Sequence, residues 1–318
     1  MFSMHEKSTT KLIKYSKTTS GMRRITVGIP AYNEERNIVN ILRSLEGQWP
    51  LISEVIVSDS SSDGTTVLVR DFARRSRLGI TLLHHRIRKG AAEAWNEILH
   101  QATGDVIVLY DADTIPHPSC TEKLASRVLE NVALCASNSQ PVQAAGIAGR
   151  ASVFISNWLT SVRRLGLSQY TVMGRALAID ATVARRIRIP SDTIAIDLYL
   201  QCKVLQMGFD VVYNDNAIVY FKPPESMKDL ASQVIRAING HNQIKNQVSQ
   251  LDISLPPHLA LAQTLKNAAL DPWGAISTMI GYSLIAYYKS RLQNTDSAKW
   301  HMADSSKEID YQQLKARF

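Results

Sequence analysis

Short apolar runs alternate with helical patterns between residues 25 and 138, and this alternation limits the folds that the chain can adopt. Runs with the length, composition and flanking breaker residues of strands cover residues 25–29, 54–57, 80–83 and 105–110. Between the first two runs, apolar residues recur at helical spacing at Ile38, Ile41, Leu42 and Leu45. Strand–helix–strand repetition predicts an α/β fold whose mostly parallel sheet is covered by helices, with ligands at the carboxyl ends of its strands.

Later segments are predicted to be helical. Residues 152–167 and 196–207 have amphipathic patterns, and residues 227–244 carry an apolar stripe with Gln233 and Arg236 beside it. The stripe consists of Met227, Leu230, Ala231, Val234, Ile235 and Ile238. We therefore divide the chain into a poorly ordered lead-in (1–23), one large domain (24–250) and a C-terminal helical extension (251–318).

The charge of the chain favours an anionic partner. A formal net charge of +8 suits a phosphorylated small molecule, a nucleic acid or an acidic membrane surface. The basic residues are dispersed and form no recognised nucleic-acid motif, so we expect no nucleic-acid partner. Three widely spaced cysteines suggest neither a disulfide framework nor a zinc site. Together with an N-terminus that lacks the apolar core of a signal peptide, they predict a cytoplasmic protein.

Polar residues follow the first, second and fourth of the predicted strands, and the first of these loops is Pro30-Ala-Tyr-Asn-Glu-Glu35. Asp111 and Asp113 come directly after residues 105–110, and two carboxylates at this spacing can share a hard cation such as Mg²⁺ or Mn²⁺. The alternative is a solvated loop that carries such a pair by chance. In the loop after the second strand, Asp59 is placed to accept hydrogen bonds from a base or ribose, whereas Asp63 predicts a turn and Thr65 a helix cap. A simple turn is the alternative for this loop.

These motifs together resemble the family 2 glycosyltransferases of the GT-A fold over roughly residues 24–245. The resemblance rests on Ile29-Pro-Ala-Tyr-Asn-Glu-Glu35, Val57-Ser-Asp-Ser-Ser-Ser-Asp-Gly-Thr65, Lys89-Gly90 with Asn96, and Gly104-Asp-Val-Ile-Val-Leu-Tyr-Asp-Ala-Asp113. It implies a GT-A (Rossmann-like) mixed, mostly parallel sheet flanked by helices, and a nucleotide-sugar donor. The residues that it places at the donor are Pro30, Ala31, Tyr32, Asn33, Glu34, Asp59, Lys89, Gly90, Asp111, Ala112 and Asp113. Asp111 and Asp113 would hold Mg²⁺ or Mn²⁺ and the diphosphate.

The same resemblance places the catalytic base at Asp197. Many relatives have Glu-Asp where this chain has Ile196 followed by Asp197, and a base needs only one ionised carboxylate near the acceptor hydroxyl. A helix N-cap is the alternative for Asp197.

Gln233-Val-Ile-Arg-Ala237 is similar to the Gln-x-x-Arg-Trp element of the polysaccharide and glycolipid synthase branch, whose Gln and Arg border the diphosphate and acceptor. Ala237 replaces the tryptophan, so the resemblance does not extend to acceptor stacking or processivity. A solvated arginine is the alternative for Arg236. Gly174 and Arg175 begin an acceptor-side segment or form a simple turn.

The predicted function is therefore an inverting transfer from a nucleotide-sugar to a saccharide or lipid hydroxyl. Asp59 and its neighbours resemble the common uridine-binding pattern and favour a UDP donor, and GDP and dTDP donors are the alternatives. A module that binds nucleotide-sugars without turnover is the alternative. His84, His85 and His117 lack metal-ligand spacing with the aspartate pair and are expected to be surface or packing residues.

Residues 272–288 contain no charged side chain, and the Trp and Tyr residues at the ends of this run are typical of a helix at a membrane interface. This pattern predicts peripheral contact with the cytoplasmic face of a membrane. A packed helix that contacts a second copy of the chain and a single membrane span are the alternatives.

Overall fold

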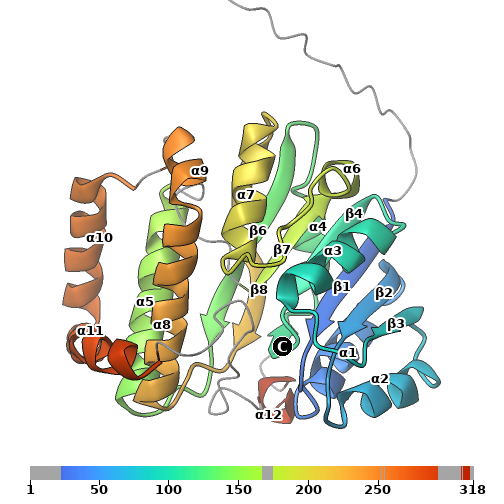
Figure 1. Ribbon diagram of the computed structural model, residues 1–318, viewed down its shortest axis with the longest axis horizontal. Helices are drawn as coiled ribbons and strands as arrows, with labels where there is room; N and C mark the ends of the chain where they lie inside the picture. The colour runs from blue at the N-terminus through green and yellow to red at the C-terminus, as the bar shows by residue number, and fades with distance from the viewer. Residues whose placement is uncertain are drawn as a thin grey trace, which may run out of the picture.

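The computed structural model describes residues 23–166, 175–251, 253, 255–292, 309 and 311–315. Within these residues, one mixed sheet of eight strands crosses the molecule, and helices cover both of its faces (Figure 1). The strand order is β3-β2-β1-β4-β7-β6-β8-β5. This architecture confirms the predicted mostly parallel sheet flanked by helices. Residues 1–22 of the predicted lead-in lie outside the described residues, and so does Gly174.

The four strands predicted at the N-terminal end are β1 to β4 of the structure. The strands are β1 (Ile25–Ala31), β2 (Ile52–Asp59), β3 (Ile80–His84), β4 (Val106–Tyr110), β5 (Thr114–Pro116), β6 (Val132–Pro141), β7 (Ala176–Asp180) and β8 (Asp210–Phe221). The helices are α1 (Ile38–Glu46), α2 (Thr65–Ala73), α3 (Ala91–Gln101), α4 (Cys120–Ala125), α5 (Gly146–Arg164), α6 (Ala181–Ala184), α7 (Ile196–Gln206), α8 (Met227–Gln243), α9 (Lys245–Gln250), α10 (Pro257–Leu270), α11 (Pro272–Leu292) and α12 (Tyr311–Lys315). The helix predicted at residues 152–167 is α5, which begins at Gly146 and ends at Arg164.

Strand β1 lies at the centre of the parallel half of the sheet. It pairs in parallel with β2 on one side and with β4 on the other, and β2 pairs in parallel with β3. Its apolar residues Ile25, Val27, Ile29 and Ala31 are buried in one cluster with residues of α1 and α2, and α3 packs against its other face. A Cβ atom at Gly28 would lie 2.3 Å from Ile98 Cγ2, so only glycine lets α3 approach β1 this closely. The parallel arrangement brings the carboxyl ends of β1, β2 and β4 to one edge of the sheet.

Strand β7 interrupts the parallel pattern because it pairs antiparallel with both β4 and β6. In its register with β4, Ala176 is opposite Tyr110, the last residue of that strand. One position further, the backbone N–H of Asp111 donates a hydrogen bond to the carbonyl oxygen of Arg175 at 3.1 Å. The antiparallel strand therefore places Arg175 beside the residues that follow β4.

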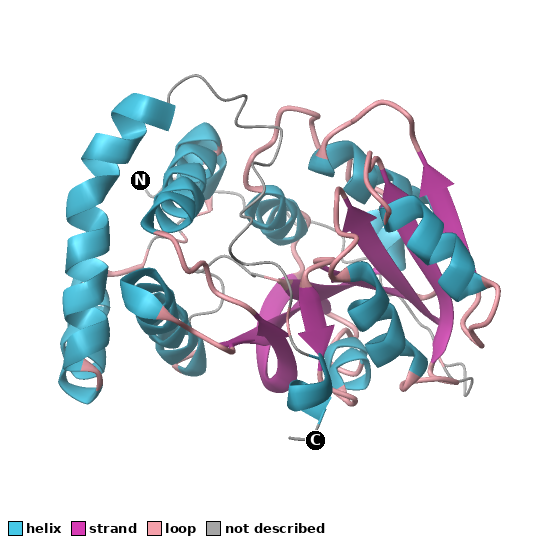
Figure 2. Cartoon of the chain, turned by 90° about the horizontal axis from the view of Figure 1, so that it is seen from below, coloured by secondary structure: helices cyan, strands magenta, loops and turns pink. Residues whose placement is uncertain are grey.

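The long C-terminal helices lie on the opposite side of the molecule from β1, β2 and β3 (Figures 1 and 2). Helix α11 packs against α5 and α8, and α10 packs against α5 and α11. None of the described helices combines the length and hydropathy that crossing a bilayer requires.

Candidate active site

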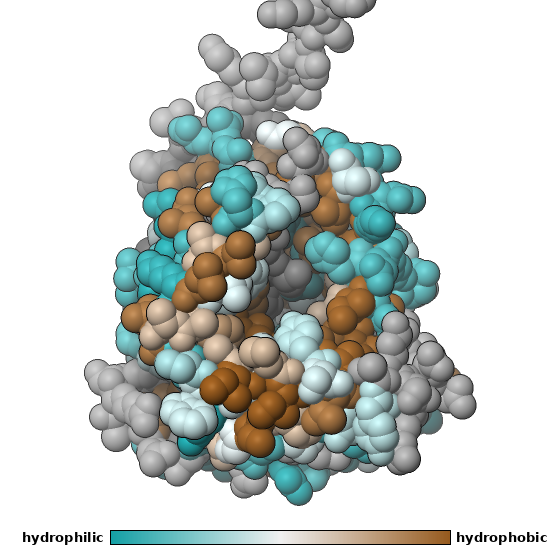
Figure 3. Space-filling model, turned by 90° about the vertical axis from the view of Figure 1, so that its left-hand side faces the viewer, coloured by the Kyte–Doolittle hydropathy of each residue, from teal (hydrophilic) through white to brown (hydrophobic). Residues whose placement is uncertain are grey.

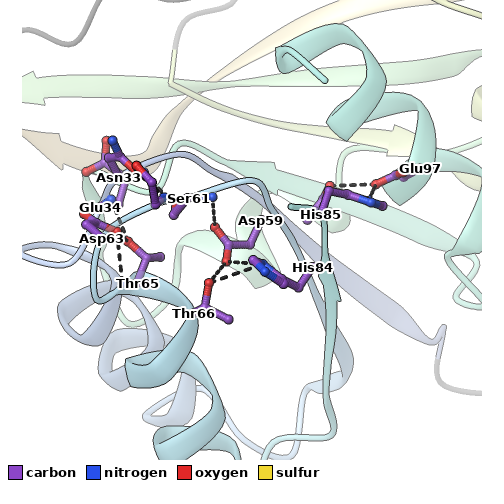
Figure 4. A network of polar contacts seen from close by, with 12 residues as sticks. Asn33, Glu34, Asp59, Ser61, Asp63, Thr65, Thr66, His84, His85 and Glu97 are labelled. Atoms are coloured by element: carbon purple, nitrogen blue, oxygen red, sulfur yellow. Dashed lines mark hydrogen bonds and ion pairs between the residues drawn. The ribbon is translucent and has the colours of Figure 1, made fainter. Parts of the chain in front are cut away.

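The loops that follow β1 and β2 are joined by hydrogen bonds between side chains and backbone (Figure 4). The backbone N–H of Asn33 donates to Ser61 Oγ at 2.7 Å, and the N–H of Ser62 donates to Asn33 Oδ1 at 2.8 Å. The N–H of Glu34 donates to Thr65 Oγ1 at 2.8 Å. Asn33 adopts a φ of 55°, a left-handed conformation that asparagine tolerates better than most residues. Residues 30–35 and 58–65 therefore form one rigid platform.

Thr65 differs from its predicted position as a helix cap. The N-cap of α2 is Gly64, which has no side chain to cap the helix, and Thr65 is the first helical residue. Asp63 Oδ1 instead accepts hydrogen bonds from the backbone N–H and the hydroxyl of Thr65. The prediction was wrong by one position because Asp63 holds this turn, as an aspartate two residues before its partner N–H commonly does.

Asp59, at the end of β2, is fully buried beneath this platform. Its carboxylate accepts hydrogen bonds from the N–H of Ser61, at 2.9 Å, and from the hydroxyl of Thr66. His84 Nδ1 lies 3.2 Å from the second carboxylate oxygen (Figure 4). Sequence analysis did not predict the contact with His84, although Asp59 and His84 are register partners in the parallel pair β2–β3. The contact could have been predicted from the sequence, because Asp59 and His84 are the last residues of two neighbouring parallel strands.

Lys89 is fixed by a carboxylate on α3. Its ammonium nitrogen lies 3.1 Å from Glu97 Oε1, while Glu97 Oε2 contacts Ser58 and His85, each at 2.8 Å. Burial acts to raise the pKa of Glu97, but the hydrogen bonds from Ser58, His85 and Lys89 outweigh it and the pKa is lowered. Glu97 is therefore ionised and holds Lys89 beside the platform. Gly90, with a φ of 91°, lets the chain turn into α3 directly after Lys89.

Asn96 of α3 is a structural residue. It is fully buried, donates a hydrogen bond to the carbonyl of Ile189 at 2.8 Å and accepts one from the N–H of Ile189 at 2.9 Å. This double contact pins the segment before α7 to α3.

Asp111 and Asp113 point toward one cationic group. Arg175 Nη1 lies 4.0 Å from Asp111 Oδ2 and 3.7 Å from Asp113 Oδ2, and its guanidinium lies 4.0 Å from the centre of the Phe221 ring. About a quarter or less of each of the three charged side chains is exposed. The two carboxylates thus converge on a positive charge in a partly desolvated position, and this arrangement suits a divalent cation. No group of three or more His, Cys, Asp or Glu side chains suited to a metal ion occurs in the described part of the chain.

Five charged side chains from four segments are electrostatic neighbours at this place. Burial, Asp113 and Asp197 raise the pKa of Asp111, Arg175 and Arg236 lower it, and the result is about 7. Burial lowers the pKa of Arg236, and so does Arg175, while Asp111, Asp197 and Asp113 act in the opposite direction. The structure therefore brings Asp111, Asp113, Arg175, Asp197 and Arg236 together.

Helix α8 sets the position of Asp197. Asp197 lies in the first turn of α7, whose N-cap is Ala195, so the N-cap alternative for Asp197 does not hold. A Cβ atom added to Gly240 of α8 would lie 2.8 Å from Ala195 Cβ. Gln243, at the end of α8, accepts a hydrogen bond from the N–H of Ile194 at 2.9 Å. The helix that carries Gln233 and Arg236 therefore also fixes the start of α7.

Arg163 is a further charged residue near the site that sequence analysis missed. It lies on α5, only 5% of its surface is exposed, and its guanidinium is 5.7 Å from the centre of the Tyr213 ring. Burial lowers the pKa of Arg163, and Tyr213 and Asp197 oppose that shift. No local pattern in the sequence distinguishes Arg163 from the neighbouring Arg164, because the burial of Arg163 depends on how α5 packs.

The chain is similar to glycosyl transferases of known sequence and structure. Residues 106–294 match the profile of Glycosyl transferase family group 2, and residues 26–163 match that of Glycosyl transferase family 2. An uncharacterized protein of Methanocaldococcus jannaschii is 24% identical over 226 residues, which are 66% of this chain and 97% of that protein. The poly-beta-1,6-N-acetyl-D-glucosamine synthase of Staphylococcus epidermidis is 21% identical over 251 residues, which are 76% of this chain but 60% of the synthase.

A similar solved structure is that of a mannosyltransferase from Pyrobaculum calidifontis in complex with GDP-Man and Mn²⁺. It matches with a TM-score of 0.61 and 21% identity, over 87% of this chain and 89% of that one. At this identity the likeness shows a shared fold.

Proposed function

The chain belongs to the family 2 glycosyl transferases, which are nucleotide-sugar-dependent enzymes, and we propose that it moves a sugar from a UDP-sugar to an acceptor hydroxyl with inversion at the anomeric carbon. The observation that carries this proposal is the convergence of Asp111 and Asp113 with Asp197 and Arg236. Displacement of a diphosphate by a hydroxyl requires three kinds of group: a carboxylate pair that binds a cation, a separate carboxylate that acts as base, and a fixed positive charge.

Asp197 is proposed to be the general base. Its carboxylate accepts the proton of the acceptor hydroxyl while that oxygen attacks the anomeric carbon on the face opposite the diphosphate. The sugar then passes directly to the acceptor, with no covalent intermediate on the protein. Arg236, and Gln233 on the same helix, are proposed to bind the departing diphosphate, since a guanidinium forms paired hydrogen bonds with phosphate oxygens.

Asp111 and Asp113 are proposed to hold Mg²⁺ or Mn²⁺. Their fit to a cation rests on the convergence of both carboxylates on the Arg175 guanidinium, and the Mn²⁺ in the Pyrobaculum calidifontis structure supports the choice. A bound divalent ion would neutralise the negative charge that develops on the diphosphate. Arg175 would then contact the phosphate oxygens or remain beside the carboxylates.

The nucleotide is proposed to lie on the platform of residues 30–35 and 58–65. Pro30, Ala31, Tyr32, Asn33 and Glu34 belong to the first of the two segments that form this platform. Asp59 lies beneath it, and Lys89 and Gly90 border it. We favour uridine because of the residues around Asp59. The relative that was solved with GDP-Man makes GDP-sugars the second donor class to test.

The acceptor is proposed to be a saccharide or a lipid that the enzyme meets in the cytoplasm or at the cytoplasmic face of a membrane. Cys120, Cys135 and Cys202 are buried free thiols, in keeping with a reducing compartment. The match to the synthase covers 60% of that protein, so its activity is a guide to the acceptor class alone.

A donor screen tests the proposal. Purified protein with Mn²⁺ or Mg²⁺ is incubated with UDP-, GDP- and dTDP-sugars, and the released nucleoside diphosphate is measured, first with water and then with candidate acceptors. We expect release from one donor class and none from the Asp113→Ala variant. Donor binding without release under any condition would instead identify a binding module.

A further inference from the structure

Helix α10 turns polar residues toward the protein and apolar residues outward. Gln263 and Asn267 face the protein, with 9% and 8% of their surfaces exposed. Leu261 and Leu265, on the other side, are 60% and 63% exposed, and Leu270 at the end of the helix is more exposed still. A helix on a water-facing protein surface shows the reverse pattern.

Helix α11 repeats this inversion with small residues on the inner side. Gly274, Ser277 and Gly281 are buried at helical spacing against α5 and α8. The residues at corresponding spacing on the outer side are large, apolar or aromatic, and exposed: Trp273, Ile276, Ile280, Leu284 and Tyr287. Met279, beside them, is also exposed. Helices that border lipid have this arrangement, with small residues toward the protein and large apolar residues outward.

Specific contacts hold both helices in this orientation. Trp158 Nε1 of α5 donates a hydrogen bond to Thr264 Oγ1 at 3.1 Å, and Asn267 Nδ2 donates to Ser161 Oγ at 3.0 Å. A Cβ atom at Gly281 would lie 3.2 Å from Leu230 Cδ2, so α11 approaches α8 closely. The inner side is therefore fixed by polar contacts and close packing, and the apolar side cannot turn inward without breaking them.

The result is a broad apolar surface, the α10–α11 face, consisting of Leu261, Leu265, Leu270, Trp273, Ile276, Met279, Ile280, Tyr282, Leu284 and Tyr287. Figure 3 shows hydrophobic residues gathered on this side of the molecule. Soluble monomers rarely expose an apolar surface of this extent without a partner.

The charges around the α10–α11 face identify the partner. Between residues 257 and 288 the sole acidic residue is Asp271, and its Oδ1 accepts a hydrogen bond from the N–H of Gly274 at 2.8 Å. Lys266 is exposed on α10, and Lys289 and Arg291 lie in the last turn of α11. An uncharged face with Trp and Tyr near its ends, and with the exposed Lys266 on α10, on a chain of net charge +8, is complementary to an anionic lipid surface.

We propose that the α10–α11 face docks on an anionic bilayer, with its Leu, Ile, Met and Trp side chains inserted at the level of the headgroups. A second copy of the chain is the other possible occupant, and the experiment below distinguishes it from a bilayer.

The docked orientation has a consequence for the substrate, which rests on the proposed sugar transfer. Helix α11 packs on α8, the helix that carries Gln233 and Arg236. A bilayer at the outer side of α11 therefore lies one helix away from the acceptor half of the site. The acceptor that this arrangement favours is a lipid or lipid-linked saccharide, presented with its hydroxyl at the membrane surface.

Vesicle flotation of the full-length protein tests the proposal. The probes are vesicles of phosphatidylcholine with and without phosphatidylglycerol. The test variant is Leu265→Glu with Met279→Glu, and the matched control is Val67→Glu with Leu129→Glu, whose side chains are 58% and 57% exposed away from α10 and α11. We expect the unaltered protein and the control to float with anionic vesicles. The test variant should partition roughly 100-fold less, about tenfold for each large apolar side chain that no longer enters the lipid.

Three results would overturn membrane docking. They are equal flotation of the test variant and the unaltered protein, unaltered protein that stays at the bottom with both vesicle types, and a stable lipid-free dimer that the test variant separates. Equal melting temperatures show that both variants fold. Release of nucleoside diphosphate without lipid is measured in parallel, so a failure of the proposed enzymatic function is seen separately from a failure of docking.

Discussion

Replacing Gly240 by alanine should impair sugar transfer from a position that contacts no substrate. Gly240 lies on α8 where that helix meets the N-cap of α7, and the added methyl group would lie 2.8 Å from Ala195 Cβ and 3.0 Å from the Ala195 backbone nitrogen. Ordinary carbon contacts are about 3.5–4.0 Å, so the two helices must separate by about 1 Å. Ala195 precedes Asp197 by two residues, and the carboxylate moves with it.

The size of the effect follows from this displacement. Overpacking of a well-packed contact costs about 1–3 kcal/mol, which should lower the melting temperature by about 2–4 °C per kcal/mol in a domain of this size. A misplacement of about 1 Å in a catalytic group can cost roughly 10²-fold in rate. We therefore expect the transfer kcat to fall by roughly 10- to 100-fold, with the donor KM nearly unchanged because the nucleotide platform is formed by other segments.

The assay is steady-state transfer with the donor found in the screen, together with thermal unfolding. Gly79→Ala is the matched control, since the nearest atom to its added Cβ is the Ser53 carbonyl oxygen at 3.9 Å. Ala195→Gly combined with Gly240→Ala removes the closest of these contacts and should recover part of the lost rate. Normal kcat and melting temperature in Gly240→Ala would refute the inference that α8 positions Asp197.

Further predictions concern the charged residues of the site. Asp113→Ala should abolish turnover and the dependence of donor binding on Mn²⁺, measured by calorimetry with and without the metal, and unchanged donor affinity and activity would contradict the metal assignment. Asp197→Asn should leave donor binding intact while transfer falls by roughly 10²-fold or more, and transfer at the normal rate would show that the base is another group. Because the pKa of Asp111 is raised from 3.8 to about 7, its carboxyl is protonated at pH 5 and must lose that proton to bind a metal. Mn²⁺ affinity should therefore rise by about tenfold per pH unit up to pH 7 and then level off, and Asp111→Asn should remove this dependence. Because Asp111 loses its proton at a lower pH in the unfolded chain than in the folded one, the free energy of unfolding of the metal-free protein should fall as the pH rises from about 4 to 7. Thermal unfolding of Asp111→Asn should show a smaller loss over this range.

Local patterns were sufficient to predict the donor half of the fold. Strands β1 to β4 were predicted because each is a short apolar run between breaker residues, and the polar loops after them were found from the same boundaries. Membrane contact was predicted for residues 272–288, which lie in α11, whereas the exposed apolar side of α10 was not predicted, because interpretation of an apolar stripe assumes that it faces inward. Even on α8, Ile238 was assigned to the apolar stripe but is exposed in the structure.

Contacts across space were beyond sequence analysis. The pairing of Arg175 with Asp111 and Asp113 depends on an antiparallel strand that begins more than 60 residues after the aspartates. The proximity of Arg163 to Asp197 depends on the packing of α5, for which no local pattern exists. The resemblance to a known family supplied Asp197 and Arg236, whereas their neighbours became visible only in three dimensions.

The antiparallel pairing of β7 with β4 also determines which changes in chain length the site can tolerate. Since neighbouring residues of a strand point to opposite faces, one residue inserted within residues 176–180 would slip the register and turn Arg175 away from the aspartates. Two inserted residues would restore the direction of the side chain but displace it by about 7 Å along the strand. Insertions and deletions should therefore be absent from β7 in active relatives, even where the connections between the other strands differ freely in length.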